Sequence, residues 1–462
     1  MKTLNLHFIC SALNLPLPNE NRAIASVKTD SRYVQEGDLF VALVGERFDA
    51  HDFAAEVATR AVAVLVSRED CRDLPNALVV DDTLVALQTL AAAWRKYINP
   101  TVLGITGSSG KTTVKEMLAH ILRHHFGENA VLATAGNFNN HIGLPLTLLK
   151  LNAQHRFAVI EMGMNHFGEL ALLTRLAQPN IALVNNALRA HVGCGFDGVG
   201  DIAKAKSEIY QGLSAAPSTG SGQGGIAIVP QEDGQLAVFE DAVCALGLSK
   251  QSFGIETGDV HAENVALNPL NSEFDLLLGN DVAKVNLPVP GKHNVANACA
   301  AAALAANVGL RAEQIAAALA SFANIKGRLQ IKQGIKNSTL LDDTYNANPD
   351  SMKAALDVLA KLPAPRVFVM GDIGELGEDE SAGMHAEVGA YAASLGIEQA
   401  YFIGSDSSYA AEKFGANGLW FAAKDPLIQV LSHDLPENAQ VLIKGSRFMK
   451  MEEVVNALKL EK

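Results

Sequence analysis

Apolar and polar positions alternate along the chain with two different periods. Short apolar runs, such as 101–106 (TVLGIT), 157–162 (FAVIEM) and 366–370 (RVFVM), are separated by longer stretches in which apolar residues recur every three or four positions. Short apolar runs are typical of buried strands, and the three-to-four spacing is typical of amphipathic helices. Strands that alternate with helices indicate a parallel sheet covered by helices, so we expect an α/β fold.

The pattern changes twice along the chain and predicts three domains, at residues 1–82, 83–325 and 326–462. In the first, a small α/β unit, strands are expected at 38–44, 61–66 and 77–80. In the second, a helix at 83–98 with Thr83 as candidate N-cap precedes strands at 101–106, 157–162, 181–185 and 226–229. In the third, a second parallel-sheet domain, strands are expected at 339–342, 366–370, 400–403 and 440–443. The Gly- and Ser-rich segment 212–225 predicts a surface loop.

The composition is that of a globular chain with several cores. Of the 462 residues, 48% are hydrophobic and 19% are charged, and the net charge is −13. Such an acidic balance argues against nucleic acid or an anionic membrane as partner, so local positive groups must hold any anionic substrate. The N-terminal segment is interpreted as a structural element rather than a cleaved signal, and we expect no membrane-spanning helix. The five cysteines form no Cys-x-x-Cys pair, which favours a reducing compartment and hence the cytoplasm.

The clearest chemical signal is the glycine-rich turn between a strand and a helix in TVLGITGSSGKTTVKEML. Gly107 and Gly110 allow a tight turn whose N–H groups can face a phosphate, and the helix N-terminus adds its positive dipole. Lys111 is placed to reach the β- and γ-phosphates, and Thr112 to bind Mg²⁺. The usual spacing has glycine where this chain has Ile105, so the loop is a variant. By itself the loop fits a kinase, a transporter ATPase or a ligase, while the missing N-K-x-D motif disfavours a GTPase.

Polar residues follow the carboxyl ends of the other central strands, where ligands bind in open α/β sheets. Glu161 ends one strand and could hold Mg²⁺ or order a water molecule, and His191 follows the next strand. Lys204 and Lys206 lie on the helix after it. Two positions apart on a helix, their side chains diverge, so we expect one at the surface and the other turned inward.

Similar polar strand ends occur in the third domain. One strand is followed by Asp342, Asp343, Asn346 and Asn348, although the Asn-Pro pair at 348–349 also suits a helix start. Another strand is followed by Lys444, Ser446 and Arg447. Two α/β domains with polar strand ends predict a cleft that closes around two substrates.

Several motifs together resemble the Mur ligases, ATP-dependent amide-forming enzymes of peptidoglycan synthesis. They are TGSSGKTT, IEMG, AHVG followed by AKAKSEI, GKHNVANACAAAALA, KGRLQ, DDTYNANPDSM, MGDIGELG and VLIKGSRFMKMEEV, and they cover nearly the whole chain in order. The resemblance implies a domain for the UDP end of a muramyl peptide, a central ATPase and a C-terminal Rossmann-like domain. The implied substrates are ATP, UDP-N-acetylmuramoyl-tripeptide and D-alanyl-D-alanine, joined through an acyl phosphate with the help of two Mg²⁺ ions.

The resemblance also implies roles for individual residues. The phosphates would lie against Gly107, Ser108, Ser109, Gly110, Lys111, Thr112 and Thr113. Thr112 and Glu161 would bind one Mg²⁺, His191 would orient the second metal site, and Lys206 matches a lysine that is carbamylated in related ligases. The remaining nucleotide contacts would be Asn294 and Asn297 to adenine, Arg328 to the γ-phosphate and Asp343 to the ribose. The muramyl-peptide path would include Ser31, Asn137, Asn139 and Asn140, and Asn346 and Asn348 would lie toward D-alanyl-D-alanine.

Two alternatives to this Mur ligase hypothesis remain open. One is a related ligase, either another Mur enzyme or a folylpolyglutamate-type ligase, against which the segment DDTYNANP argues. The other is a nucleotide-gated binding protein, against which the set Lys111, Glu161, His191 and Lys206 argues. For the ligase we expect a monomer.

Overall fold

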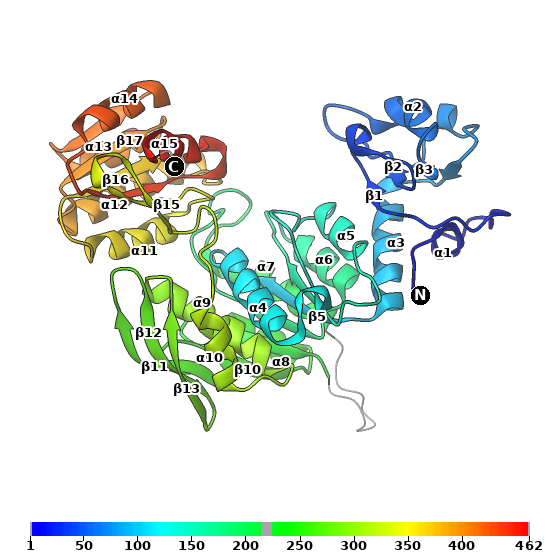
Figure 1. Cartoon of the computed structure of the whole chain (residues 1–462), viewed down its shortest axis with the longest axis horizontal. Coiled ribbons are helices and arrows are strands. Elements are labelled where there is room, and N and C mark those ends of the chain that lie inside the picture. Colours follow the sequence, from blue (N-terminus) through cyan, green and yellow to red (C-terminus); the bar gives the residue numbers. More distant parts are fainter. Residues whose placement is uncertain (1, 214–223, 461–462) are drawn as a thin grey trace.

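The computed structural model describes residues 2–213 and 224–460 and contains three sheets (Figure 1). The expected loop at 212–225 lies largely outside the described residues. Figure 1 shows the first and last sheets at opposite ends of the molecule, with the largest sheet between them. The α/β fold in three parts is therefore confirmed. Among the described helices, none combines the length and the apolar character that crossing a membrane requires.

The first part is a four-stranded parallel sheet in the order β1-β2-β3-β4. Its strands are β1 (Val27–Lys28), β2 (Leu39–Val41), β3 (Ala63–Val66) and β4 (Ala77–Val79). Two short helices accompany it, α1 (Leu6–Ala12) and α2 (Ala54–Ala58). The N-terminal segment thus forms a structural element, α1, as expected.

Helix α3 (Thr83–Ile98) connects the first sheet to the second and has the predicted bounds. Its N-cap, however, is Asp82 and not Thr83, so that prediction is wrong. The Asp82 carboxylate accepts hydrogen bonds from the N–H groups of Leu84 and Val85, which Asp82 can reach because its own backbone is still extended. Thr83 is already helical, and its hydroxyl donates to the carbonyl oxygen of Ala42 at 2.7 Å, which fastens α3 to the first sheet.

The second sheet has nine strands in the order β13-β12-β11-β10-β9-β8-β5-β7-β6. They are β5 (Thr101–Thr106), β6 (Val131–Ala133), β7 (Phe157–Glu161), β8 (Ile181–Val184), β9 (Ile226–Pro230), β10 (Ser249–Phe253), β11 (Val260–Leu267), β12 (Ser272–Leu278) and β13 (Asp281–Leu287). Neighbours from β6 to β11 are parallel, while β11, β12 and β13 are antiparallel.

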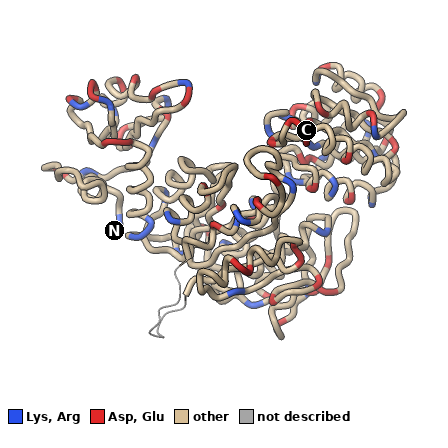
Figure 2. Tube along the Cα trace, turned by 180° about the vertical axis from the view of Figure 1, so that it is seen from behind, with Lys and Arg blue, Asp and Glu red and all other residues tan. Residues whose placement is uncertain are grey.

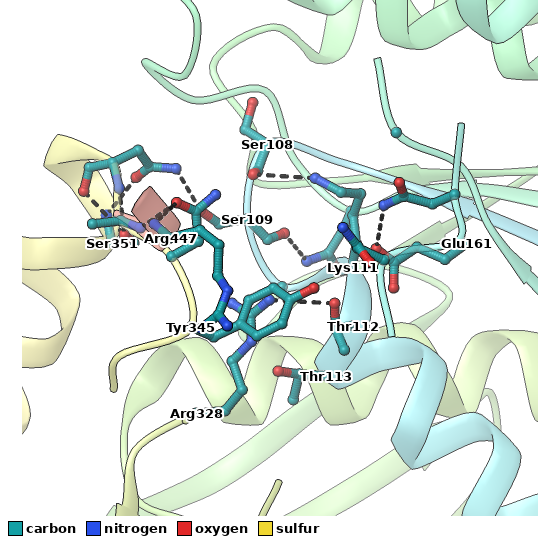
Figure 3. A pocket seen from close by; sticks show the side chains of 18 of the residues that line it. Ser108, Ser109, Lys111, Thr112, Thr113, Glu161, Arg328, Tyr345, Ser351 and Arg447 are labelled. Carbon is teal, nitrogen blue, oxygen red and sulfur yellow. Dashed lines mark hydrogen bonds between the residues drawn. The ribbon is translucent and has the colours of Figure 1, made fainter. Parts of the chain in front are cut away.

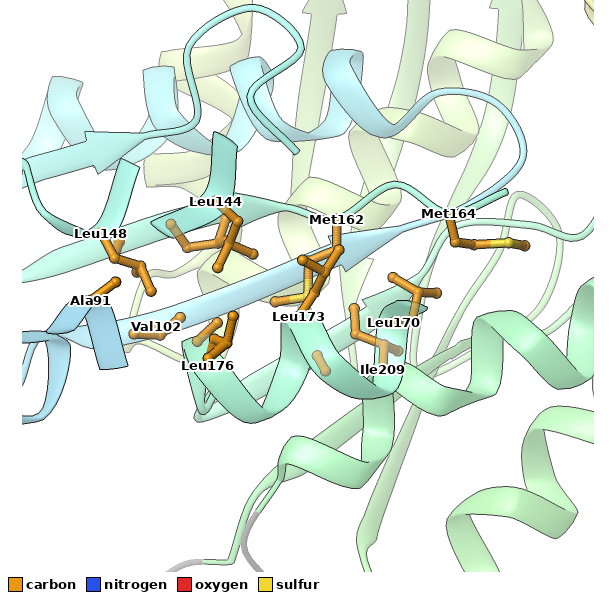
Figure 4. Close-up of a cluster of buried hydrophobic side chains, with 14 of the residues drawn as sticks. Ala91, Val102, Leu144, Leu148, Met162, Met164, Leu170, Leu173, Leu176 and Ile209 are labelled. Carbon is orange, nitrogen blue, oxygen red and sulfur yellow. The ribbon is translucent and has the colours of Figure 1, made fainter. Parts of the chain in front are cut away.

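Helices cover both faces of this sheet. One face packs against α3, α5 (Gly143–Leu148), α6 (Glu169–Ala177), α7 (Val199–Ser207) and α8 (Leu236–Ala245) (Figure 4). The other packs against α4 (Lys111–Phe126), α9 (Lys292–Ala306) and α10 (Ala312–Ala320). Within β5, Val102 belongs to the first core and Leu103 to the second, so the sheet is buried on both sides, as parallel sheets usually are.

The third sheet has six strands in the order β14-β15-β19-β16-β17-β18. They are β14 (Gln330–Gln333), β15 (Thr339–Asp343), β16 (Arg366–Gly371), β17 (Gln399–Ile403), β18 (Gly418–Phe421) and β19 (Gln440–Lys444), and only the edge strand β14 is antiparallel to its neighbour. One face packs against α11 (Pro349–Ala360), α12 (Glu378–Ser394) and α13 (Ser407–Phe414), and the other against α14 (Lys424–Asp434) and α15 (Glu452–Leu458).

Charged residues of both signs are interspersed along the whole trace. Figure 2 shows Lys and Arg next to Asp and Glu in each of the three parts of the chain. Anion binding must therefore come from individual positive groups at a site rather than from one basic domain.

Candidate active site

A cleft of about 1050 Å³ lies between the second and third sheets, at the carboxyl ends of their strands. One wall is formed by the residues that follow β5, β7 and β8, and the other by those that follow β15, β16 and β19. Figure 3 shows Lys111 and Glu161 on one side of this pocket and Ser351 and Arg447 on the other. The cleft between two sets of polar strand ends, predicted from the sequence, is confirmed.

The phosphate loop lies between β5 and α4. Gly110 has a φ of 79°, and a Cβ atom there would come within 2.4 Å of the side chains of Asn185 and Asn297, so only glycine fits. The Lys111 ammonium donates to the carbonyl oxygen of Gly107 at 2.6 Å, and burial lowers its pKa. Ile105, the departure from the usual motif, is buried inside β5, so it leaves the turn itself unchanged.

Two asparagines that the sequence analysis missed hold the phosphate loop in place. Asn185 donates to the carbonyl oxygen of Ser109 at 2.9 Å. Asn186 accepts the backbone N–H groups of Ser108, at 3.1 Å, and Ser109, at 2.9 Å. These two N–H groups are therefore engaged. No described side chain caps the N-terminus of α4, so the N–H groups of its first turn remain available to an anion. Both asparagines follow β8, where the strand-end rule could have found them.

Glu161 ends β7 and is 2% exposed. Its Oε1 accepts a hydrogen bond from the Asn139 amide at 2.9 Å, whereas its buried Oε2 has no hydrogen-bond partner among the described residues. A buried, unpartnered carboxylate oxygen is costly unless a cation or a ligand binds there. No cluster of three or more His, Cys, Asp and Glu in the described ranges could hold a metal ion. One carboxylate beside a phosphate loop fits Mg²⁺, which is usually bound by one or two carboxylates together with substrate phosphates.

His191 and Glu375 face each other across the cleft. The His191 Nδ1 lies 3.6 Å from a Glu375 carboxylate oxygen, and both residues have left-handed backbones, with φ of 66° and 61°. Such conformations cost of order 1–3 kcal/mol and cluster at functional sites. Burial first, and then the charges of Lys206 and Lys111, lower the pKa of His191 to about 3. The imidazole is therefore neutral at pH 7 and can act as a metal ligand. The sequence analysis did not single out Glu375.

The two lysines of α7 diverge as predicted. Lys204 is exposed and pairs with Asp201 at 3.0 Å, whereas Lys206 is 2% exposed. Burial lowers the pKa of Lys206 well below its usual value, and the charge of Lys111 lowers it further. Lys206 does not line the cleft itself, but it lies close enough to His191 for a charge on its side chain to change the pKa of the imidazole.

Asn294 and Asn297, at the start of α9, line the cleft with amides that are already engaged. Asn294 donates to the carbonyl oxygen of Pro290 at 2.8 Å and accepts from Asn297 at 3.3 Å. The Asn297 oxygen accepts from Asn185, which itself holds the phosphate loop. In this structure the pair supports the phosphate loop.

Two predicted nucleotide contacts come from the third sheet and the segment before it. Arg328 donates to the Thr112 hydroxyl at 3.3 Å, and its guanidinium lies 4.2 Å from the centre of the Tyr345 ring. Each oxygen of the Asp343 carboxylate accepts one hydrogen bond, from the Leu329 N–H at 3.1 Å and from the Lys444 ammonium at 2.5 Å.

The predicted substrate residues divide into two groups. Asn137, Asn139, Asn140, Asn346 and Asn348 all line the cleft, together with the phosphate loop. Asn348 is also the N-cap of α11, as its sequence suggested, and its amide donates to the Ser109 hydroxyl at 2.8 Å. Ser31 is not brought to the cleft. It lies in the first part of the chain, where its carbonyl oxygen accepts from Arg60 at 2.9 Å.

An ion-pair network joins the second and third sheets beside the cleft. Arg189, in the loop after β8, binds Asp350 at 2.6 Å and Glu387 at 2.7 Å. Its backbone N–H also donates to Asp350, and the Gly377 N–H donates to the carbonyl oxygen of Val192 at 2.9 Å. The loop that carries His191 is thus fixed to α11, α12 and the segment before α12.

Comparison with known proteins identifies the family to which this chain belongs. The family model of the Mur ligase middle domain matches residues 105–305, and that of the Mur ligase glutamate ligase domain matches residues 327–447. Together they cover most of the chain, which belongs to the Mur ligase family of ATP-dependent amide ligases.

Individual relatives resemble the chain over nearly their full length. It is 41% identical to the UDP-N-acetylmuramoyl-tripeptide–D-alanyl-D-alanine ligase of Haemophilus influenzae, over 96% of this chain and 95% of that one. It is 42% identical to the ligase of the same name from Escherichia coli, over 99% of both. A crystal structure of MurF from Acinetobacter baumannii superposes with a TM-score of 0.89 at 37% identity, covering 99% of this chain and 98% of that one. The MurF ligase of Thermotoga maritima in complex with ADP has a TM-score of 0.81 at 26% identity, covering 94% and 96%.

Proposed function

We propose that the protein ligates D-alanyl-D-alanine to the terminal carboxylate of UDP-N-acetylmuramoyl-tripeptide and converts ATP to ADP and phosphate. The observation that carries this proposal is the cleft between the two sheets. Its first wall holds a phosphate loop and the unpartnered oxygen of Glu161, and its second wall is a separate set of strand ends. The curated relatives at 41% and 42% identity carry this reaction in their names.

The chemistry requires activation because a free carboxylate is a poor electrophile. The carboxylate oxygen attacks the γ-phosphorus of ATP and ADP leaves, which gives an acyl phosphate. The amine of D-alanyl-D-alanine then attacks the acyl carbon, loses a proton, and expels phosphate. Lys111 and the first turn of α4 hold the phosphate oxygens, and Arg328 adds positive charge from the opposite wall. Preorganised charges of this kind stabilise the transition state of phosphoryl transfer.

We propose that Thr112 and Glu161 hold one Mg²⁺ ion and that His191 and a carbamylated Lys206 serve a second. When bound, these ions neutralise the gathered oxyanions and polarise the γ-phosphate. The unpartnered Oε2 of Glu161 supports the first site, and the neutral imidazole of His191 supports the second. The low pKa of Lys206 supports the carbamate, because only a neutral amine reacts with CO₂.

We assign each substrate to one part of the chain. Residues 1–82, with Ser31, take the UDP end, residues 83–325 take ATP, and residues 326–462 take D-alanyl-D-alanine. Within the cleft, Asn294 and Asn297 lie toward adenine and Asp343 toward the ribose. Asn137, Asn139 and Asn140 face the muramyl peptide, and Asn346 and Asn348 face the dipeptide.

The alternatives have less support. A structure of folylpolyglutamate synthase from Mycobacterium tuberculosis is only 16% identical to this chain, so it supports the fold alone, whereas relatives named for the D-alanyl-D-alanine reaction reach 42%. Family membership also argues against a binding protein that merely hydrolyses ATP. We further propose that the protein acts as a monomer in the cytoplasm, and the five unpaired cysteines support a reducing compartment.

The direct test is a coupled assay of phosphate release with ATP and Mg²⁺. UDP-N-acetylmuramoyl-tripeptide and D-alanyl-D-alanine are added separately and together, and the product is identified by mass spectrometry. We expect fast release only with both, with formation of the UDP-pentapeptide. Equal release without either peptide substrate would reject the ligase and favour a nucleotide-gated binding protein.

A further inference from the structure

The segment that carries Arg328 is tied to the end of β15 on both sides. The N–H of Tyr345 donates to the carbonyl oxygen of Gly327 at 3.1 Å, and the N–H of Leu329 donates to Asp343 at 3.1 Å. Gly327 has a φ of 70°, and a Cβ atom there would lie 3.3 Å from the Tyr345 nitrogen, so glycine allows this close approach. Arg328 and Tyr345 therefore belong to one unit of the third sheet.

The guanidinium of Arg328 reaches from this unit to the opposite wall of the cleft. It donates to the hydroxyl of Thr112, at the start of α4, while its Nε is buried and has no hydrogen-bond partner among the described residues. Its described contacts are thus one 3.3 Å hydrogen bond and the face of the half-buried Tyr345 ring, 4.2 Å away (Figure 3). A guanidinium over an aromatic face is attracted to the ring, most strongly when water is excluded.

We propose that Tyr345 is a positioning residue whose ring holds the Arg328 guanidinium toward the phosphate loop. The inference rests on the proposed function, in which Arg328 stabilises the γ-phosphate during transfer. A guanidinium has five N–H donors, so one bond to Thr112 leaves others for phosphate oxygens. The Tyr345 ring and Arg328 are attached to the third sheet, whereas Thr112 belongs to the second. Arg328 therefore reaches the phosphate loop only when the two sheets have the arrangement seen in this structure.

The test compares substitutions of Tyr345 in the full-length protein by steady-state kinetics. Tyr345→Leu removes the ring, Tyr345→Met is a second variant without a ring, and Tyr345→Phe keeps the ring without the hydroxyl. Tyr391→Leu is the matched control, since Tyr391 also lies under a cation, Lys353, at 5.2 Å but outside the cleft. Thermal unfolding confirms that each variant is folded.

We expect Tyr345→Leu and Tyr345→Met to lower kcat about tenfold, the effect of roughly 1.4 kcal/mol on a barrier, with a smaller change in the KM for ATP. Tyr345→Phe should remain close to the parent, and so should Tyr391→Leu. In an Arg328→Ala background, the loss of the Tyr345 ring should have no further effect, because the two residues act through one group.

Three results would overturn the inference while leaving the proposed function intact. They are an unchanged kcat in Tyr345→Leu when Arg328→Ala is impaired, a Tyr345→Phe variant as impaired as Tyr345→Leu, and additive losses in the double variant. A folded Arg328→Ala variant with the parent kcat would instead remove the proposed role of Arg328 itself, and the inference with it.

Discussion

The two walls of the cleft differ in how their polar groups are used. On the wall of the second sheet, Glu161 Oε2 and Asn185 Oδ1 are buried without a hydrogen-bond partner among the described residues. On the wall of the third sheet, the groups at the strand ends mostly bond within the wall, as in the pair of Asp343 and Lys444 and the capping box of Asn348. Two side-chain atoms of this wall, Arg328 Nε and Glu452 Oε2, are also buried without a partner among the described residues. The strand ends of the first wall therefore have bonding capacity directed at ligands, whereas the strand ends of the second form a preformed surface from which Arg328 reaches toward the phosphate loop.

This difference indicates a division of labour between the walls. Unpartnered buried groups cost stability and persist where a ligand satisfies them, so the wall of the second sheet is expected to provide the chemistry. The internally bonded wall of the third sheet is expected to orient the second substrate. Substitutions on the first wall, and at Arg328 and Tyr345, which reach the phosphate loop from the second, should mainly affect kcat and, on the first wall, metal dependence. Other substitutions that loosen the second wall should mainly affect the KM of the incoming dipeptide.

Loss of Lys111 should have the largest effect on the first wall. Lys111→Ala removes the charge beside the phosphate loop, and we expect kcat to fall by about 10²-fold or more, as when other preorganised groups are removed. The measurement is the coupled phosphate assay on protein shown to be folded by thermal unfolding. A near-parental kcat in folded Lys111→Ala would remove the ATP assignment.

Substitution of Lys206 tests whether the second metal site belongs to the wall of the second sheet. An ammonium 4 Å from a cation would be repelled by roughly 4 kcal/mol per charge pair at an effective dielectric constant of 20, so a carbamate is the form that fits. Lys206→Ala should lose most activity, formate or acetate should partly restore it, and CO₂-depleted buffer should slow the parent.

The matched control for Lys206 is Lys204→Ala, which removes an exposed lysine from the same helix and should keep full activity. A fully active Lys206→Ala variant would exclude the carbamate. A completely inactive variant that formate and acetate do not restore would also count against it.

Asn139 should affect metal binding more weakly, because it acts through Glu161. Asn139→Ala leaves Oε1 of Glu161 without its amide donor, and the Mg²⁺ concentration for half-maximal activity should rise about tenfold, which is typical of residues that orient metal ligands. In Asn140→Ala the Mg²⁺ dependence should be unchanged, since the Asn140 oxygen accepts from the Gly143 N–H at the start of α5. Equal Mg²⁺ dependence in Asn139→Ala and the parent would contradict the role of Glu161.

Substitution of Arg189, whose ion pairs hold the second wall against the first, should have the smallest effect on the kinetics. This arginine holds the pKa of Glu387 at about 2, so the contact between the sheets persists throughout the neutral range. The network is partly exposed, so Arg189→Ala should cost about 1 kcal/mol, or roughly a fivefold higher KM for D-alanyl-D-alanine at nearly constant kcat. Arg366→Ala breaks a similar pair with Glu398 inside the third part of the chain and should leave that KM unchanged. A large loss of kcat in Arg189→Ala alone would contradict the division between the walls.

The sequence predicted most of the parallel strands because continuous apolar runs are a local signal, but it did not predict the parallel strands β1, β6, β10 and β18. The strand at 101–106 and the helix at 83–98 have the expected bounds, since continuous apolar runs and helical spacing need no tertiary information. The antiparallel hairpins of β11, β12 and β13 were not predicted. Their residues alternate between buried and exposed, and the separate apolar positions form no continuous run.

The candidate site was predicted only in part for the same reason. The phosphate loop and Glu161 follow strands that are easily recognised, so their meeting at one sheet edge could be inferred. The contact of Arg328 with Tyr345 and the approach of Glu375 to His191 depend on how two sheets are packed, which no local pattern encodes. Ser31 likewise lies far along the chain from the cleft, in a part of the molecule joined through α3.

The central claim, transfer of phosphate to the substrate carboxylate, is tested most directly with ¹⁸O. Both oxygens of the terminal carboxylate of UDP-N-acetylmuramoyl-tripeptide are labelled, and the products formed with ATP and D-alanyl-D-alanine are analysed by mass spectrometry. Because the acyl phosphate breaks when the amine attacks the acyl carbon, phosphate should leave with one labelled oxygen, and the new amide should retain the other. Amide formation with unlabelled phosphate would contradict the account.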